Sequence, residues 1–247
     1  MVSTFGVRGA EPPGCSGSQG RPVGAVPIGA SSLDEEIMVT TTSVGQKSPS
    51  LLQRVRDRFR RDYDESKPTS PQALSLTLAL RRLWADHVIW TREYVVAAIA
   101  DAPDAGAVAG RLLKNQEDLG NAVVPFYGEA AGSRLTELLK EHVMIAVDLV
   151  AAAKSGDQAK FSQADAAWDR NATNIASFLA SANPNWPEKD VADLLGQHLT
   201  LTKNEAVARL KSSWEDDIEA FDQIFTEILT VADVLAAGII TQFPKRF

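Results

Sequence analysis

The sequence predicts an all-α fold: a six-helix bundle built from three tandem helical hairpins and preceded by a disordered arm. Two observations lead to this prediction. Apolar residues recur every three or four positions from Ser70 onward, and a pattern of about 55 residues containing one histidine occurs three times. The predicted organisation is a low-complexity arm over residues 1–49, a basic segment and linker over 50–69, and the bundle over 70–247.

The first 49 residues have the composition of a disordered segment. Glycine and proline are concentrated there, and the apolar residues show almost no periodicity. Such a segment cannot bury enough apolar surface to offset the entropy lost on ordering. It also lacks the basic start and apolar block of a secretory signal, and we expect a cytoplasmic protein.

A short basic amphipathic segment follows the arm. Its apolar residues, Leu51, Leu52, Val55 and Phe59, are at helical spacing among five arginines, and the segment ends at Tyr63. Two interpretations stay open. The segment packs on the acidic body of this protein or is simply disordered, or it contacts an acidic partner or an anionic membrane surface.

The predicted helices begin and end at residues with known roles in capping. Ser70 offers a capping hydroxyl and Pro71 suits a first turn, whereas Pro125 and Gly128 are expected to end the second helix. Ser213 and the residues after it have the spacing of a capping box. The corner 183–187 reads Asn-Pro-Asn-Trp-Pro, and the predicted helices cover about 71–101, 105–124, 133–154, 158–182, 188–211 and 214–240.

The repeat places one histidine at the same position in each hairpin. The segments LRRLWADHV, LTELLKEHV and VADLLGQHL contain His87, His142 and His198, which are separated by 55 and 56 residues. The second helices of the hairpins also match, and their alignment makes Asn115, Asn171 and Glu227 equivalent.

Each histidine continues the apolar seam of its helix and is therefore expected in the interior. If the repeats surround a pseudo-threefold axis, the three imidazoles meet. If the repeats stack in a line, they stay about a helix diameter apart. Three imidazoles with one open position are a known environment for zinc or iron, so a site for a divalent metal or a small ligand is one hypothesis. Its metal ligands would be His87, His142, His198 and Glu227, supported by Asn115, Asn171 and Asp233.

A structural role is the alternative hypothesis. Duplication copies a core histidine as readily as a metal ligand, and the matched amide and carboxyl groups can satisfy its ring nitrogens. For Asp148 and Glu205 a solvated position is favoured, while for Asp233 burial and exposure are equally expected. Spacing alone selects no nucleophile and no acid–base pair, so the question of an enzyme stays open.

Composition argues against several other classes. A net charge of −7 disfavours nucleic-acid binding, and the lone Cys15 excludes a thiolate zinc cluster. No phosphate-binding glycine loop occurs. The longest apolar run, 228–240, is interrupted by Asp233, so no membrane span is expected. The oligomeric state is not indicated.

Several segments together resemble a family of small, uncharacterised helical proteins from soil bacteria and methanogens, some of which carry a glycosyltransferase label. They include LWADHVIWTREYVVAAIADAP, LLKEHVMIAVDLVAAAKSGD and ADVLAAGIITQFPKRF, and the resemblance covers about residues 71–247. It implies a shared helical fold. The transferase label is not supported by these residues, because nucleotide-sugar transferases are expected to need a parallel sheet.

Overall fold

A computed structural model describes residues 50, 53–54, 57 and 70–247 of the chain. The predictions for the arm over 1–49 and for most of the basic segment over 50–69 lie outside these residues. Internal contacts divide the chain between Gln46 and Lys47, and the six long helices belong to the second unit.

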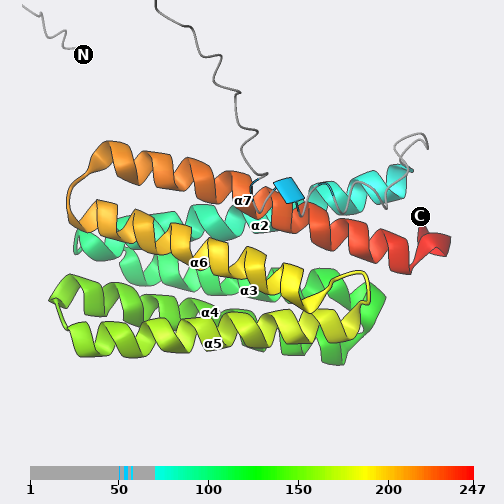
Figure 1. Ribbon diagram of the computed structural model, residues 1–247, viewed down its shortest axis with the longest axis horizontal. Helices are drawn as coiled ribbons and strands as arrows, with labels where there is room; N and C mark the ends of the chain where they lie inside the picture. Colours follow the sequence, from blue (N-terminus) through cyan, green and yellow to red (C-terminus); the bar gives the residue numbers. More distant parts are fainter. Residues whose placement is uncertain (1–49, 51–52, 55–56, 58–69) are drawn as a thin grey trace, which may run out of the picture. The chain divides into compact units, whose positions relative to one another are not determined.

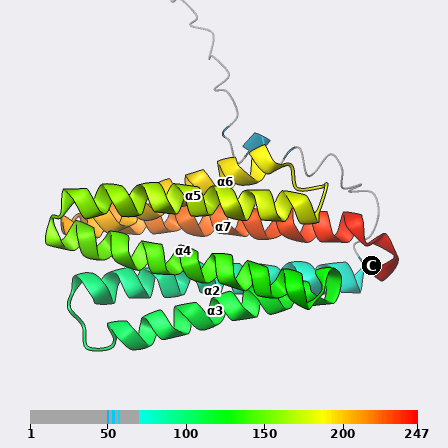
Figure 2. The ribbon, with the colours of Figure 1, turned by 90° about the horizontal axis from the view of Figure 1, so that it is seen from below.

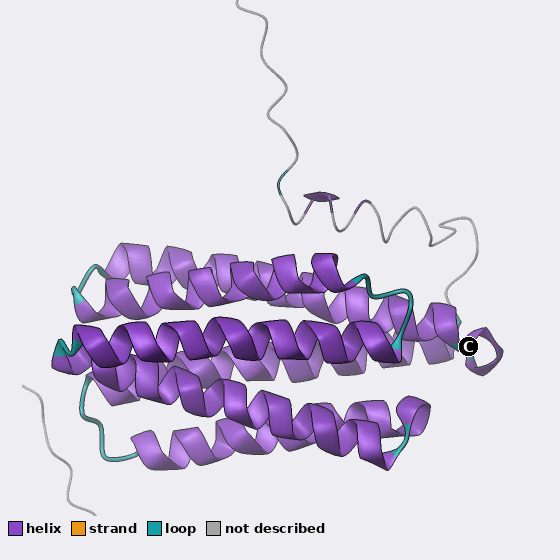
Figure 3. Cartoon of the chain, turned by 60° about the horizontal axis from the view of Figure 1, so that its bottom comes forward, coloured by secondary structure: helices purple, strands orange, loops and turns teal. Residues whose placement is uncertain are grey.

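The described part of the bundle is entirely helical, which confirms the predicted fold class (Figure 3). Short loops join six long helices, and a single turn of 3-10 helix (η1, Pro244–Arg246) closes the chain. The long helices are α2 (Pro71–Ile99), α3 (Ala105–Tyr127), α4 (Glu129–Ser155), α5 (Gln158–Ala182), α6 (Glu188–Leu210) and α7 (Trp214–Gln242).

The six helices form a closed ring in chain order. Each helix packs against the next, and α7 returns to pack against α2, while α2, α4 and α6 also contact one another. The helix axes run along one common direction (Figures 1 and 2). The first helix of each hairpin therefore faces the shared interior, which is where the equivalent positions of the repeat come together.

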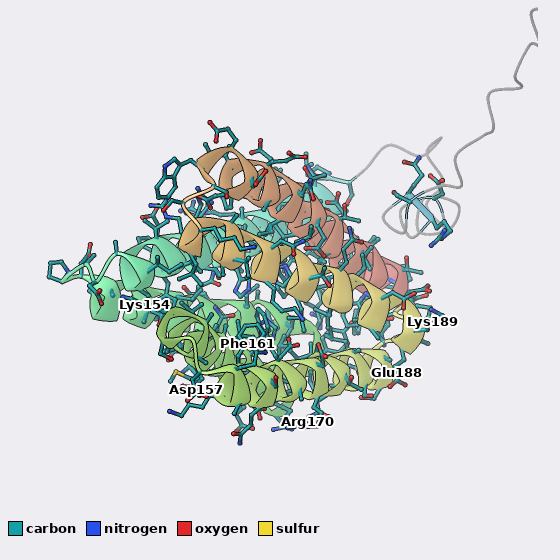
Figure 4. All side chains as sticks on the ribbon, turned by 60° about the vertical axis from the view of Figure 1, so that its left-hand side comes forward. Lys154, Asp157, Phe161, Arg170, Glu188 and Lys189 are labelled. Atoms are coloured by element: carbon teal, nitrogen blue, oxygen red, sulfur yellow. The ribbon has the colours of Figure 1, made fainter. Side chains whose placement is uncertain are left out.

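Side-chain capping at the helix ends agrees in part with the sequence. Ser70 caps α2 as predicted, because its hydroxyl accepts a hydrogen bond from the Ala73 amide at 3.0 Å. Asp157 caps α5 in the same way through the Lys160 amide. Figure 4 shows Asp157, Phe161 and Arg170 along α5, with Lys154 at the end of α4. The predicted capping box at α7 is wrong, since Ser213 makes no side-chain capping bond.

Pro125 does not end α3, contrary to prediction. The helix continues to Tyr127, and Gly128, with a φ of +83°, separates it from α4. Proline in the last turn removes only one backbone hydrogen bond, so two further residues stay helical. The chain then enters α4 at Glu129, four residues earlier than the predicted start at Ser133.

Two glycines let α3 and α4 approach closely. A Cβ atom added at Gly120 would lie 2.6 Å from the backbone oxygen of Gly132, and one added at Gly132 would lie 2.8 Å from that of Gly120. Any larger side chain at either position would force the helices apart. Sequence analysis attached no role to this pair.

Two buried side chains, Asn183 and Trp186, anchor the corner before α6. Asn183 is fully buried, and its Oδ1 atom accepts a hydrogen bond from the Asn185 amide at 2.9 Å. Trp186 is 2% exposed, lies against Gly238 of α7 and donates its ring N–H to the Val234 carbonyl at 3.2 Å. The rigid corner predicted from Asn-Pro-Asn-Trp-Pro thereby fixes α6 to α7.

Among the described residues, α7 is long and apolar enough to cross a membrane by length and composition. Asp233 interrupts the longest apolar run but does not lower the mean hydropathy of the whole helix below this criterion, and the expectation of no membrane span stays a prediction. In the structure 61% of its most apolar window is buried inside the bundle. The core helix of a bundle meets the same criterion.

Candidate metal centre

The structure brings the three predicted histidines together. His87 on α2, His142 on α4 and His198 on α6 are 3%, 4% and 3% exposed. One ring nitrogen of each lies within 4.8 Å of those of the other two. The ring centroids are 5.7 Å apart for His87 and His198, 6.2 Å for His142 and His198, and 6.3 Å for His87 and His142. The histidines therefore meet, as a ring of repeats predicts and a linear stack does not.

A side chain from the second helix of the same hairpin contacts each ring on the side away from the cluster. The partner comes 29 residues after the histidine in every case and contacts the Nδ1 atom. Gln116 contacts His87 at 3.2 Å, Asn171 contacts His142 at 3.0 Å, and Glu227 contacts His198 at 3.1 Å. Because Nδ1 faces the outer helix, Nε2 is the nitrogen that remains for a ligand in the interior.

The polarity of these contacts differs among the three rings. Asn171 and Glu227 present oxygens to Nδ1 of His142 and of His198, so these Nδ1 atoms donate. In the neutral His142 ring the lone pair then lies on Nε2. Gln116 instead presents its Nε2 amide nitrogen to His87, and its Oε1 atom is buried without a partner. The same Nε2 atom donates to the Leu112 carbonyl at 2.8 Å, so Nδ1 of His87 is the acceptor and the neutral ring carries its hydrogen on Nε2, the opposite tautomer from His142.

The predicted role of Asn115 needs correction. The direct partner of His87 is the next residue, Gln116, because the alignment of the outer helices is shifted by one position in the first repeat. Asn115 supports that partner: its Oδ1 atom accepts from Gln116 at 3.1 Å, and its Nδ2 atom donates to the Leu83 carbonyl at 2.9 Å. A constant spacing of 29 residues from each histidine would have identified Gln116.

Glu227 lies behind the His198 ring. Its side chain is fully buried, its Oε2 atom accepts from Nδ1 of His198, and its Oε1 atom has no hydrogen-bond partner. The donor atoms that cluster within 4.8 Å come from the three histidines. Glu227 therefore orients one imidazole and supplies a nearby carboxyl group, a different place from the fourth ligand position that the sequence suggested.

Two of the imidazoles are neutral at neutral pH. Burial, together with the nearby His198 ring, lowers the pKa of His142 to about 3. Burial and the two neighbouring imidazoles also hold the pKa of His87 well below its usual value of 6.5. Neither ring would therefore release a proton on binding a metal at pH 7, although in His87 the hydrogen would have to pass from Nε2 to Nδ1.

Aromatic side chains form part of the wall around the cluster. Trp168 of α5 lies 5.1 Å from the His142 ring, and Trp84 of α2 meets the His87 ring edge to face at 5.7 Å. Both tryptophans are buried, and the ring N–H of Trp168 has no hydrogen-bond partner. These rings cover part of the surface of the His142 and His87 imidazoles.

A small cavity adjoins the three imidazoles. Its volume is about 20 Å³, and its wall includes His87, His142, His198, Thr91 and Thr202. One water molecule needs about 10–15 Å³ on the same measure. The cavity therefore has room for about one water-sized ligand beside the imidazoles.

The other predicted acidic residues lie elsewhere. Asp233, suggested as a supporting residue, pairs with Arg81 through two hydrogen bonds of 2.6 and 2.5 Å, and both side chains are about 40% exposed. Asp148 is exposed, as expected. The expectation of a solvated Glu205 is wrong, because this residue is 1% exposed.

Glu205 belongs to a buried ionic network that sequence analysis missed. Arg92 of α2 bonds Glu205 of α6 at 2.5 Å and both carboxylate oxygens of Asp217 of α7, which also pairs with Arg209. Burial raises the pKa of Glu205 to about 7, although the Arg92 guanidinium acts in the opposite direction. Arg92 is more than 100 residues from Glu205 and from Asp217 along the chain, so no local spacing reveals these two pairs.

The fold and the site together define an all-α bundle with a buried cluster of three histidines at its centre. Comparison of the chain with protein-family profiles, with curated proteins and with solved structures found no match.

Proposed function

We propose that the bundle binds one divalent transition-metal ion, Zn²⁺ or Fe²⁺, through His87, His142 and His198. The observation that carries the proposal is the convergence of three buried ring nitrogens within 4.8 Å of one another. Neutral imidazole is a ligand for both ions. The cluster offers nitrogen donors and no carboxylate, which disfavours Ca²⁺ and Mg²⁺ because these ions prefer oxygen.

A metal bound here would require the three ring nitrogens to move only slightly closer together. A point equidistant from three nitrogens that are 4.8 Å apart lies about 2.8 Å from each, whereas metal–nitrogen bonds measure about 2.0–2.1 Å. Each nitrogen would have to move inward by about 0.7 Å, which small side-chain rotations can provide. In addition, the His87 hydrogen would have to pass from Nε2 to Nδ1, and Gln116 would have to exchange its bonds to the Leu112 carbonyl and to Asn115 for a bond from that nitrogen.

The outer hydrogen bonds also favour a metal. Metal-binding histidines commonly donate their second ring nitrogen to a carboxylate or an amide oxygen, which fixes the ring and raises its basicity. His142 and His198 already have such partners in Asn171 and Glu227. A cation in the cluster would also compensate the Glu227 carboxylate, whose Oε1 atom is buried without a hydrogen bond.

Metal analysis of protein purified without a histidine tag tests the proposal. We expect one Zn²⁺ or Fe²⁺ per chain after incubation with either ion and removal of the excess, and none in the variant in which all three histidines are changed to alanine. Absence of stoichiometric metal from the folded wild-type protein would contradict the proposal.

A matched pair of variants tests the role of Glu227. Glu227→Gln keeps the size of the side chain and removes its charge, and we expect metal affinity to fall about 10- to 100-fold in a chelator competition. The control is Glu137→Gln, the same change at a residue of α4 whose side chain is 67% exposed. Equal affinities for both variants would contradict the role given to Glu227.

A structural bundle is the second candidate function. It is favoured by the hydrogen bond that each Nδ1 atom already makes, because these bonds join the two helices of every hairpin. In that case single His→Gln changes would lower the melting temperature while the protein binds no metal before or after the change. The two candidates therefore differ in the metal content of the wild-type protein.

A further inference from the structure

The cavity beside the histidines continues along the bundle in layers of equivalent residues. Thr91, Ala146 and Thr202 come four residues after the three histidines, and Val95, Val150 and Ala206 come eight residues after them; all six line the cavity. Four residues make about one helical turn. The cavity therefore runs from the imidazoles toward the carboxyl-terminal ends of α2, α4 and α6.

The far end of this cavity is apolar. Val95, Val150 and Ala206 are 2%, 5% and 3% exposed and form a small core cluster of their own. In the layer between, the hydroxyls of Thr91 and Thr202 donate to the backbone carbonyls of His87 and His198 at 2.7 and 2.9 Å. These hydroxyls are thus already hydrogen-bonded to the backbone of their own helices. The wall of the cavity contains no Asp, Glu, Lys or Arg side chain.

We infer that the fourth coordination position of the proposed metal opens into this cavity and accepts only ligands of one or two non-hydrogen atoms. This inference rests on the proposed metal site. A volume of about 20 Å³ holds one water molecule, a hydroxide or a diatomic molecule such as O₂ or NO. Three protein ligands with one open position are the arrangement of metal sites that bind an exchangeable ligand, whereas structural zinc sites use four protein ligands.

Cobalt(II) provides the test, because it substitutes for both ions and its visible absorption reports the ligands around it. The wild-type protein is loaded with Co²⁺, desalted, and mixed with one equivalent of cyanide or with an excess of imidazole. We expect cyanide to change the absorption spectrum and imidazole to leave it unchanged. A response to imidazole equal to the response to cyanide would overturn the size limit.

Ala146 offers a way to fill the cavity without touching a histidine. The Ala146→Leu variant is expected to hold the same amount of Co²⁺ and to bind cyanide at least tenfold more weakly. Ala146→Val is the milder variant, because valine has the shape of the threonines at the two equivalent positions. We expect its loss of cyanide affinity to be smaller than that of Ala146→Leu. The control is Ala166→Leu, because Ala166 is an exposed residue of α5. This variant should hold Co²⁺ and bind cyanide as the wild-type protein does.

The outcomes separate this inference from the metal proposal. Wild-type protein that holds no Co²⁺ would overturn both. Wild-type protein that holds Co²⁺ but binds imidazole would overturn the inference alone, as would wild-type affinity for cyanide in both Ala146 variants.

Discussion

At the scale of single residues, Glu205 shows how burial changes a carboxyl group. It is 1% exposed, hydrogen-bonded to Arg92 and close to Asp217, whose negative charge adds to the cost of ionising it. The pKa of Glu205 rises from 4.5 to about 7, with burial as the largest cause. The protonated form is thus favoured in the folded protein relative to the unfolded chain.

This shift predicts a dependence of stability on pH. Between about pH 4.5 and pH 7 the unfolded chain loses the Glu205 proton while the folded protein retains it, so the contribution of this group to stability falls as pH rises. The slope is at most about 1.4 kcal/mol per pH unit. Urea denaturation of metal-free protein at pH 5, 6 and 7 measures it, and Glu205→Gln should remove this component.

The control for this prediction is Glu137→Gln, since Glu137 is exposed on α4 and makes only a local ion pair with Arg134. It should leave the pH dependence of the wild-type protein unchanged. An identical pH dependence in Glu205→Gln and in the wild-type protein would show that Glu205 has an ordinary pKa.

At the scale of helices, contacts between distant parts of the chain set the packing. Asp217 lies in the first turn of α7 and is bonded by Arg92 of α2 and Arg209 of α6. Glycines matter at two other contacts, one between α3 and α4 and one where Trp186 lies against α7. The sequence gives no sign of the contacts of Arg92 with Asp217 and of Trp186 with Gly238, because these partners lie far apart along the chain.

A change at Gly238 should therefore destabilise the bundle. A Cβ atom at this position would lie 1.9 Å from the Trp186 ring nitrogen, so the indole would have to move and would lose its hydrogen bond to the Val234 carbonyl. We expect Gly238→Ala to lower the free energy of unfolding by about 1–3 kcal/mol, measured by chemical denaturation.

Gly196→Ala is the matched control, because Gly196 lies within α6 and a Cβ atom there would meet nothing within 4 Å. The higher helix propensity of alanine should raise stability by up to about 1 kcal/mol. Equal effects of the two changes would show that Trp186 does not restrict Gly238.

At the scale of the whole molecule, the proposed metal would connect all three hairpins at the centre of the ring. A ligand that binds only the folded protein stabilises it by mass action, by about 2.7 kcal/mol at a free concentration 100 times Kd. We therefore expect Zn²⁺ to raise the melting temperature of the metal-free protein, as followed by circular dichroism. His142→Gln should abolish most of this rise, and an equal rise in both proteins would place the bound zinc elsewhere.

Prediction from sequence succeeded where the signal is local or repeated. The apolar spacing gave six helices, and the recurrence of histidine every 55 or 56 residues indicated equivalent interior positions. It was wrong at the end of α3, because the effect of Pro125 depends on how little of the helix follows it. It also missed Gln116, because the first repeat is offset by one residue.

The amino-acid sequence alone thus determined the helical class of residues 70–247, the three hairpins and the place of one histidine in each. Only the tertiary structure decided that these histidines meet, that Glu227 lies behind His198, that Glu205 is buried and that the adjoining cavity holds about 20 Å³. The physical reason is the range of the interactions involved. Helix formation depends on neighbours within a turn or two, whereas closure of the ring by α7 against α2 depends on packing between opposite ends of the bundle sequence.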